Sequence, residues 1–345
     1  MRLLLKEIQR TRLLMLIHWK ESGKWDLYRT LIHRVGKLDI LQFYYSKLPF
    51  WNRISYILSE FYLPLISLMR RNEYDIIISW SMRLGICYGI LNRLFGKLRF
   101  PKHIIYDFHI NLTRNDPFYK LRLKLLNLAI PGIDFYFTTS HKEIEIYSKQ
   151  FGIRPDRMEF YPMTPARHLL EKGAYPKGDY VFSYGNSDRD YDTLIKAVED
   201  IQFKIVILSK TYTPKQPLPQ QITLIREKTW QELLELIGSS RMVVIPLQSF
   251  WVSAGQTAML ETLALGRPLI VTSNMATIEY ATDQKTALFF EAGDDGKLKR
   301  HIHFLMSNPE AAENMGQRAR LSVSKNAERR LIIFLRVLDY LLKDR

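Results

Sequence analysis

The stretch that decides the fold is residues 253–272, SAGQTAMLETLALGRPLIVT. Its pattern predicts a loop, a helix and then a strand, because Gly266 and Pro268 end the helix before the β-branched run that follows. Gly255 allows the backbone to approach a ligand closely at the start of that helix. Since the free N–H groups of a helix N-terminus favour an anion, the stretch predicts a seat for a phosphate group.

Three polar residues belong to this predicted seat. Gln256 and Thr257 stand at the helix start, and Glu261 follows one turn further along, on the face of Thr257. At that position the carboxylate of Glu261 could accept hydrogen bonds from the diol of a ribose. The alternative interpretation of this stretch is a capped core helix that carries a surface glutamate.

Outward from this stretch, short apolar runs alternate with helical periodicity, and such alternation is typical of doubly wound parallel sheets. The predicted strands cover residues 74–78, 103–106, 135–139, 158–161, 180–184, 203–208, 222–225, 242–246, 268–272 and 287–290. The predicted helices include residues 119–129, 142–151, 192–200, 230–239, 257–265 and 297–307. The first 70 residues are rich in aromatic side chains, and their pattern assigns no strand.

Prolines, a glycine and charges interrupt both periodicities over residues 164–178. We therefore expect an N-terminal domain over residues 1–170 and a C-terminal domain over residues 171–325. A closing helix over residues 326–345 is expected to pack back on the body, because Leu331, Ile332, Leu335, Leu338 and Leu342 recur at helical spacing.

Length and composition bound the class of protein. The chain has 345 residues, of which 47% are hydrophobic and 25% charged, so it is globular and long enough for two domains. Its single cysteine, Cys87, excludes an internal disulfide, and no Cys and His cluster has zinc spacing. A reducing, cytoplasmic setting is expected.

The net charge of +15 is placed unevenly along the chain. Residues 1–180 hold 29 Lys and Arg against 16 Asp and Glu, whereas the rest hold 21 against 19. Residues 119–130 mix cations with leucines, which suits either an anionic membrane surface or a core helix with a basic edge. No bilayer span is expected, since the best candidate, residues 54–69, contains Glu60 and Pro64.

The N-terminus begins like a signal peptide, but charges interrupt residues 1–16 and no small-residue cleavage site follows, so we expect no export.

The decisive stretch, with residues 278–283 and 286–294 after it, resembles the C-terminal half of the retaining glycosyltransferases called glycosyl transferases group 1. The similarity extends from Tyr180 to about Ala319 and includes Tyr184, Gly185, residues 189–197 and Pro246. It implies the GT-B fold, which is α/β with two Rossmann-like doubly wound domains facing a central cleft. It also implies that the C-terminal domain holds a nucleotide-diphosphate sugar and the N-terminal domain an acceptor.

Carried over residue by residue, the resemblance departs from the family at two positions. The family commonly has two glutamates eight positions apart; Glu261 matches the second, whereas Ser253 stands in place of the first. Asn186 falls where the family has an arginine that clasps the diphosphate, and Arg189 aligns with the accompanying lysine. Lys210 is the candidate for a substitute cation, and its alternative interpretation is a solvated loop charge.

The resemblance implies further site residues. Gly185 belongs to the donor loop, Arg226 begins the segment beside the nucleotide base, and Glu279 lies beside the donor site. His109 resembles the histidine that family members present to the donor sugar. The D-x-D spacing of Asp190 and Asp192 marks a helix cap rather than a metal site, so no metal is predicted.

The expected function is therefore transfer of a sugar from a nucleotide-diphosphate sugar to a lipid-linked or polysaccharide acceptor, with retention and without a metal. The donor is a substrate, and no separate cofactor is expected. An anionic membrane surface is an expected partner, at the inner face of the plasma membrane, and nucleic acid is not. The alternatives are a degenerate GT-B fold that acts as a membrane or nucleic-acid adaptor, and a sugar-nucleotide epimerase.

Overall fold

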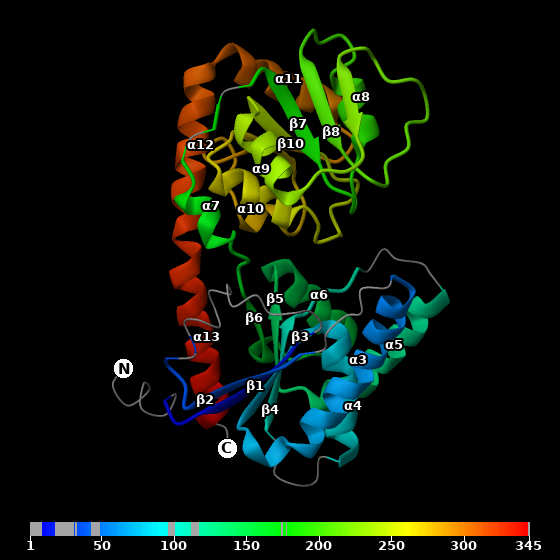
Figure 1. Ribbon diagram of the computed structural model, residues 1–345, viewed down its shortest axis with the longest axis vertical. Helices are drawn as coiled ribbons and strands as arrows, with labels where there is room; N and C mark the ends of the chain where they lie inside the picture. The colour runs from blue at the N-terminus through cyan, green and yellow to red at the C-terminus, as the bar shows by residue number, and fades with distance from the viewer. Residues whose placement is uncertain are drawn as a thin grey trace. The chain divides into compact units, whose positions relative to one another are not determined.

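The computed structural model describes residues 9–17, 31, 33–42, 49–95, 101–111, 117–173, 175, 176 and 178–343. The chain divides into two compact units. Unit 1 comprises Met1–Ile110, Arg114–Tyr161 and Arg330–Arg345, and unit 2 comprises Asn111–Thr113 and Pro162–Arg329. Each unit is an α/β body built on its own sheet (Figure 1).

The sheet of unit 1 is entirely parallel and has the strand order β2-β1-β3-β4-β5-β6. Its strands are β1 (Arg12–Ile17), β2 (Lys37–Gln42), β3 (Ile76–Ser81), β4 (Lys102–Asp107), β5 (Phe135–Thr138) and β6 (Met158–Phe160). Residues 13–17 of β1 are buried on both faces, as a central parallel strand requires.

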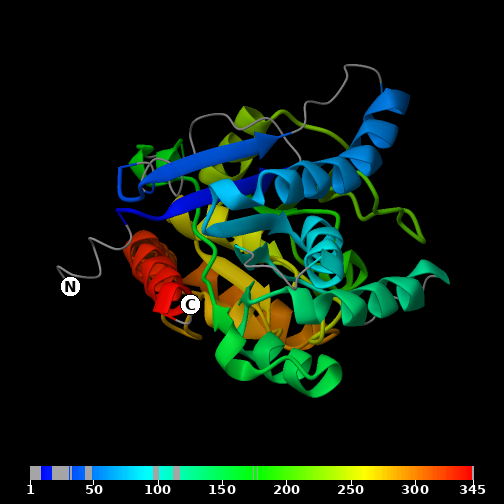
Figure 2. The same ribbon diagram turned by 90° about the horizontal axis from the view of Figure 1, so that it is seen from below.

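Helices cover both faces of this sheet. On one face, α3 (Pro49–Met69), α4 (Met82–Phe95) and α5 (Pro117–Ala129) form a layer that packs through Leu63 and Tyr88 against β1 and β3. On the other face, α13 (Asn326–Lys343) buries Phe334 and Leu338 against β1, β3, β4 and β5. Figure 2 shows α13 and the layer of α3, α4 and α5 on opposite sides of the sheet. The helix α6 (His141–Phe151) packs beside β5 and β6.

The sheet of unit 2 is also entirely parallel, in the order β12-β11-β10-β7-β8-β9. Its strands are β7 (Tyr180–Tyr184), β8 (Lys204–Leu208), β9 (Ile222–Ile225), β10 (Met242–Ile245), β11 (Leu269–Thr272) and β12 (Leu288–Phe290). The order in which strands are added changes side between β7 and β10: β8 and β9 follow β7 toward one edge of the sheet, whereas β11 and β12 follow β10 toward the other. In open parallel sheets the carboxyl ends of the strands at such a switch point are where ligands bind.

Helices also cover both faces of the second sheet. The helices α8 (Tyr191–Ala197) and α11 (Asp295–Ser307) pack on one face through Leu194 and Ile302. The helix α10 (Gln256–Ala264) lies over the opposite face. Val244 of β10 belongs to the core that Leu194 and Ile302 help to form, and the next residue, Ile245, points to the other face of the sheet, where it contacts Gly255 at the start of α10. The remaining helices are α7 (Arg167–Glu171), α9 (Trp230–Ser239) and α12 (Pro309–Ser324).

The fold class predicted from the sequence is confirmed, and the strands expected from residue 74 onward are all present within a few residues. The first 70 residues hold elements that the sequence reading left unassigned, namely β1, β2 and α3. The signal-like start contains the beginning of β1, an apolar run too short and too uniform to show a period. Residues 54–69 belong to α3, and among the described residues no helix is long and apolar enough to cross a bilayer.

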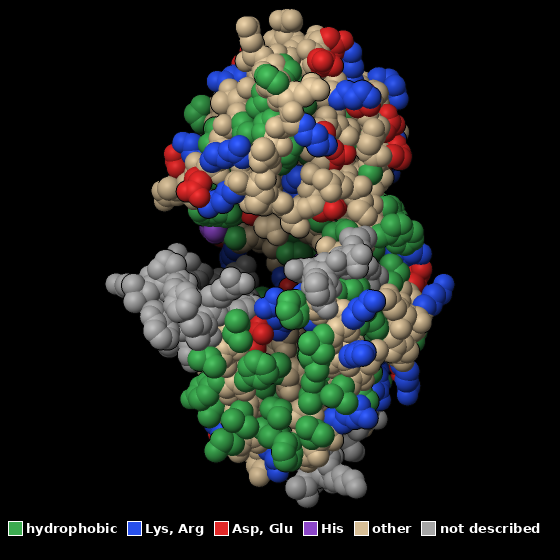
Figure 3. Space-filling view, turned by 90° about the vertical axis from the view of Figure 1, so that its right-hand side faces the viewer, with side chains coloured by type: hydrophobic (Ala, Val, Ile, Leu, Met, Phe, Trp, Pro, Cys, Tyr) green, Lys and Arg blue, Asp and Glu red, His purple; other side chains and the backbone are tan. Residues whose placement is uncertain are grey.

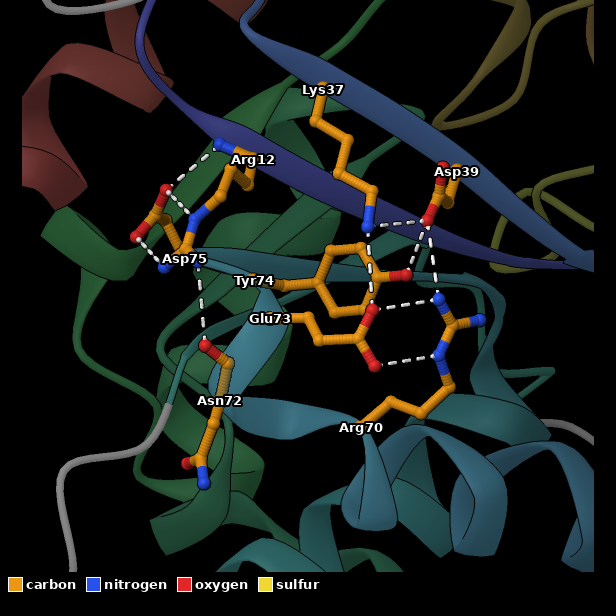
Figure 4. Close-up of polar contacts among 8 residues, drawn as sticks. All are labelled: Arg12, Lys37, Asp39, Arg70, Asn72, Glu73, Tyr74 and Asp75. Atoms are coloured by element: carbon orange, nitrogen blue, oxygen red, sulfur yellow. Dashed lines mark hydrogen bonds and ion pairs between the residues drawn. The ribbon is translucent and has the colours of Figure 1, made fainter.

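A network of charges joins the amino ends of the first three strands of unit 1 (Figure 4). Asp75, just before β3, accepts hydrogen bonds from the backbone N–H of Arg12 at 2.8 Å and from its Nη2 at 3.2 Å. In β2, Asp39 accepts from the hydroxyl of Tyr74, and Lys37 pairs with Asp39 at 3.0 Å. The network therefore gives hydrogen-bond and ion-pair partners to polar groups at the edge of the sheet where these three parallel strands begin.

We expect Asp75→Ala to lower the free energy of unfolding by about 1–3 kcal/mol, because it leaves the N–H of Arg12 without its acceptor. Chemical denaturation of the full chain, followed by circular dichroism, measures the change. The matched control is Asp179→Ala, which removes an exposed partner of Arg241 beside β7 and should change stability by less than about 0.5 kcal/mol. Equal effects of the two substitutions would contradict a structural role for the network.

Candidate functional site

Two loops of unit 2 meet at the switch point of its sheet. One loop follows β7 and contains Gly185 and Arg189, and the other follows β10 and leads to Gly255. The loops are in direct contact, since Arg189 and Leu247 form an isolated antiparallel bridge and a Cβ at Gly255 would lie 3.1 Å from Leu247 Cδ1. The residues predicted for the donor loop are therefore brought together at one edge of the sheet.

The helix α10 begins at this edge without a side-chain cap. Its N-cap residue, Gly255, has φ 90°, a left-handed conformation that favours glycine. As a glycine, this N-cap residue supplies no side-chain hydrogen bond to the first turn, and no acidic residue lies in that turn. Gln256 is buried and Thr257 is exposed, so the helix presents its start to solvent on the side of Thr257. This is the local geometry that an anion seat requires.

Tyr184, the last residue of β7, connects the two halves of the site. Its hydroxyl donates to Glu261 Oε2 at 2.7 Å and lies 2.9 Å from the carbonyl oxygen of Ala258, and both partners are on α10. Its own carbonyl oxygen accepts from Arg189 Nε at 2.9 Å. The guanidinium of Arg189 also donates through Nη1 to the carbonyl of Ser187 at 2.7 Å. The charge of Arg189 is thus fixed beside the carboxylate of Glu261.

Glu261 is buried, so the alternative of a surface glutamate is wrong. Burial raises the pKa of its carboxyl to about 7, against the opposite effects of the Tyr184 hydrogen bond and the Arg189 charge. Because the folded-state pKa is raised, protonation of Glu261 stabilises the fold. That contribution is complete below about pH 4.5 and is lost as the pH rises through about 7.

The cations predicted beside the donor are placed differently from one another. Burial lowers the pKa of Arg189, whereas Lys210 is exposed and pairs with Glu227 at 2.8 Å. Arg226 donates to the carbonyl oxygens of Ser209 and Tyr212, so it holds the loop after β8. Only Arg189 of these three is both fixed and next to α10.

Asn186, which the resemblance aligned with an arginine of the family, has a structural role in the loop after β8. Its Oδ1 accepts from the backbone N–H of Lys210 at 2.8 Å and lies 3.2 Å from the hydroxyl of Ser209. The amide oxygen of Asn186 is therefore used in hydrogen bonds to the loop after β8. Beside it, Asp190 caps α8 by accepting from the N–H of Thr193 at 3.1 Å, and the predicted capping role is confirmed.

Asn274 is a site residue that sequence reasoning missed. Its Nδ2 donates to the carbonyl oxygens of Val252 and Ala254, and its Oδ1 accepts from the N–H of Ala276 at 2.9 Å. The buried side chain therefore ties the segment around Ser253, also buried, to the turn after β11. The signal was present, since an asparagine two residues after a predicted strand is a common loop-organising residue. Glu279 ends the short 3₁₀ helix of that turn and is partly exposed.

His109 lies in unit 1, just after β4. Its Nδ1 is 2.9 Å from Oε1 of Glu143, a fully buried carboxylate that also accepts from the N–H of Thr139 and the hydroxyl of Tyr147. Burial opposes the charged imidazole, but Glu143 and the charge of Asp107 outweigh it and raise the pKa of His109. With Nδ1 committed to Glu143, Nε2 is the atom left to contact a ligand. Sequence reasoning missed Glu143.

Two cavities lie within unit 2. One of about 410 Å³ adjoins the loops after β7 and β8 and is lined by Asn186, Arg189, Lys215 and Gln248 among others. The second, of about 430 Å³, lies at the amino ends of β10 and β11, beside Arg267. Residues 253–261 line neither of these two cavities.

Comparison with known proteins bears on the family and the fold of the chain. Residues 171–322 match the family described as glycosyl transferases group 1. The chain is 24% identical over 205 residues to the putative glycosyltransferase EpsD of Bacillus subtilis, a match that covers 53% of this chain and 52% of EpsD. The chain thus spans about half the length of the curated relative it matches.

Solved structures share the fold over nearly the whole chain. Sucrose-phosphate synthase from Thermosynechococcus elongatus aligns with a TM-score of 0.69 at 13% identity, covering 97% of this chain and 100% of that one. Anabaena HepE in complex with UDP-glucose aligns with a TM-score of 0.65 at 12% identity and the same coverage. These likenesses confirm the GT-B fold class, with two Rossmann-like parallel-sheet domains.

We expect Tyr184→Phe to raise the pKa of Glu261 further above its ordinary value, because it removes the hydrogen bond that favours the carboxylate. Carbon-detected NMR titration of the side-chain carboxyl measures the pKa directly. The matched control is Tyr180→Phe at the other end of β7, whose hydroxyl donates to Leu236 instead. A pKa of Glu261 that is the same in both variants would show that Tyr184 does not set it.

Proposed function

We propose that the chain is a member of the glycosyl transferases group 1, the family that residues 171–322 match, and that it transfers a sugar from a nucleotide-diphosphate sugar to a lipid-linked or polysaccharide acceptor. The observation that carries this proposal is the start of α10, which no side chain caps and which lies beside the fixed guanidinium of Arg189 at the switch point of the sheet. The complex of HepE with UDP-glucose supports a donor of this kind.

The charge that such a reaction develops matches these residues. Breaking the bond between the anomeric carbon and the phosphate oxygen leaves positive charge on the sugar ring and negative charge on the departing nucleotide diphosphate. In this proposal the first turn of α10 and Arg189 stabilise the diphosphate, and Lys210 adds a second cation once it leaves its exposed pair with Glu227. Electrostatic stabilisation of the leaving group then supplies the main catalytic effect.

The proposed stereochemical course is retention without a metal. The acceptor hydroxyl attacks from the face that the diphosphate leaves, its oxygen bonds to the anomeric carbon, and its proton passes to a phosphate oxygen of the leaving group. This route needs no strong protein base, which suits a chain with Ser253 in place of the first family glutamate. Gly185 and Gly255 admit the diphosphate, while Gln256, Thr257, Glu261 and Glu279 are proposed to contact the donor.

His109 is proposed to present Nε2 to the donor sugar, as the resemblance implies. Glu143 supports this role because its hydrogen bond fixes the orientation of the imidazole through Nδ1. Arg226 is proposed to lie near the nucleotide base, where the loop after β9 is held against the loop after β8. The donor is a substrate in this account, and no additional cofactor takes part.

The proposed setting is the inner face of the plasma membrane, with the chain bound peripherally. The net charge of +15 and its concentration in residues 1–180 support attraction to anionic lipid headgroups. A lipid-linked acceptor would be presented at the same surface.

A second candidate function is a degenerate GT-B fold that binds a membrane or nucleic acid as an adaptor. One observation favours it: Asn186 uses its amide oxygen to hold the loop after β8, so at this position the family's diphosphate-binding cation is replaced by a structural contact. Turnover of any nucleotide sugar would exclude this candidate. An epimerase would need further acid and base side chains, and no observation favours it.

The first test of the proposed function is donor binding. We expect UDP, GDP or ADP to raise the melting temperature of the full chain, and Thr257→Glu to weaken that nucleotide's affinity at least about tenfold, because a carboxylate at the helix start repels phosphate. The substitution should not unfold α10, since an acidic residue in the first turn suits the helix dipole. Thermal shift and isothermal titration calorimetry measure both effects.

The matched control is Gln231→Glu, at the same second position of α9 and equally exposed, which should leave the affinity unchanged. Hydrolysis of nucleotide sugars by the wild-type chain separates an enzyme from an adaptor. The proposed function is wrong if no nucleotide stabilises the chain, or if Thr257→Glu binds the nucleotide as tightly as the control.

A further inference from the structure

The helix α3 of unit 1 exposes apolar side chains and buries small polar ones. Its outer surface carries Ile57, Leu58, Phe61, Leu65 and Met69, of which Phe61 is 62% exposed and Met69 is 76% exposed. Its inner surface includes Ser59 and Ser67, which are fully buried, and Ser67 donates its hydroxyl hydrogen bond to the carbonyl of Pro64. The inner surface also buries Leu63 and Leu68 in the core, so the helix is apolar on both sides, and its exposed apolar face is suited to an apolar partner.

The helix α5 repeats this feature. Its exposed apolar side chains are Phe118, Leu121, Leu125 and Leu128, which follow one another at helical spacing along one stripe. The helix α4 packs against both α3 and α5, and its exposed end adds Leu94 and Phe95. We call the outer surface of these three helices the α3–α5 face. Figure 3 shows hydrophobic side chains gathered over this side of unit 1, with Lys and Arg side chains among and beside them.

The charges on the α3–α5 face have one dominant sign. Among the described side chains at residues 57–69, 82–95 and 118–129, the exposed cations are Arg83, Arg93, Lys120 and Lys124, and Arg122 is half-buried. The carboxylate in the same ranges is Glu60, which pairs with Arg83 at 3.1 Å. An apolar surface with a cationic rim is complementary to a layer of anionic headgroups above hydrocarbon.

We propose that the α3–α5 face docks on the surface of an anionic lipid bilayer, with α3 and α5 lying in the plane of the headgroups. The apolar stripes enter the boundary between headgroups and acyl chains, and the lysines and arginines contact lipid phosphates. A second copy of the chain fits this face less well, because a symmetric dimer would bring one mainly cationic face against an identical face of the partner. The docking needs no nucleotide or acceptor, so it holds whether or not the chain transfers a sugar.

The test is flotation of the full chain with vesicles of phosphatidylcholine and phosphatidylglycerol, and with vesicles of phosphatidylcholine alone. We expect binding to the anionic vesicles that weakens steeply with added salt. Phe61→Glu with Leu65→Glu should abolish flotation, and Lys120→Glu with Lys124→Glu should weaken it about tenfold or more. All four side chains are exposed, so both variants should fold, as circular dichroism can verify.

Matched controls carry the same substitutions elsewhere on the surface. Leu321→Glu with Ile332→Glu replaces side chains that are each 66% exposed, and Lys204→Glu with Lys285→Glu reverses two exposed cations of unit 2. Both controls should bind vesicles like the wild type. Three outcomes would overturn the proposal: no binding to anionic vesicles, equal binding to neutral ones, or equal loss in the controls. Light scattering that shows a dimer dissociated by Phe61→Glu with Leu65→Glu, in a chain that ignores vesicles, would assign the face to self-association instead.

Discussion

The hydrogen bonds of Tyr184 hold the candidate site of unit 2 together. Its carbonyl oxygen accepts from Arg189 and its hydroxyl donates to Glu261, so one residue at the end of β7 fixes both a cation and a buried carboxyl. The position of this site is a consequence of topology, because β7 and β10 are the neighbouring strands at the switch point of the sheet. The loops that leave these two strands contact each other through Arg189 and Leu247, and the carboxyl ends of strands at such a switch point are where open parallel sheets bind ligands.

Unit 1 uses the two ends of its sheet differently. At the amino ends of β1, β2 and β3, Arg12, Asp39 and Asp75 belong to a network that neutralises charges in pairs. At the carboxyl end of β4, the His109 and Glu143 pair leaves one imidazole nitrogen for a ligand. Parallel strands impose this asymmetry, since all amino ends meet at one edge and all carboxyl ends at the other.

The sequence predicted the sheet of unit 2 well, because its strands are apolar runs separated by glycines, prolines and helices. It missed β1 and β2, whose short runs lie among charges, and it placed Ile332 on the buried face of α13, where the structure has Ile333 and exposes Ile332. The contacts of individual side chains were harder to predict from the sequence than the strands. The burial of Glu261 and the role of Asn274 depend on contacts between segments distant in the chain, which no local pattern contains.

The most direct test of the account is amide hydrogen exchange of residues 255–260 with and without the nucleoside diphosphate that stabilises the chain. If backbone N–H groups at the start of α10 bind the diphosphate, exchange at Gln256, Thr257 and Ala258 should slow when the nucleotide is added. Amides at the start of α9, at residues 230–232, provide the internal reference. Unchanged exchange at 256–258, with protection appearing elsewhere in unit 2, would contradict the claim.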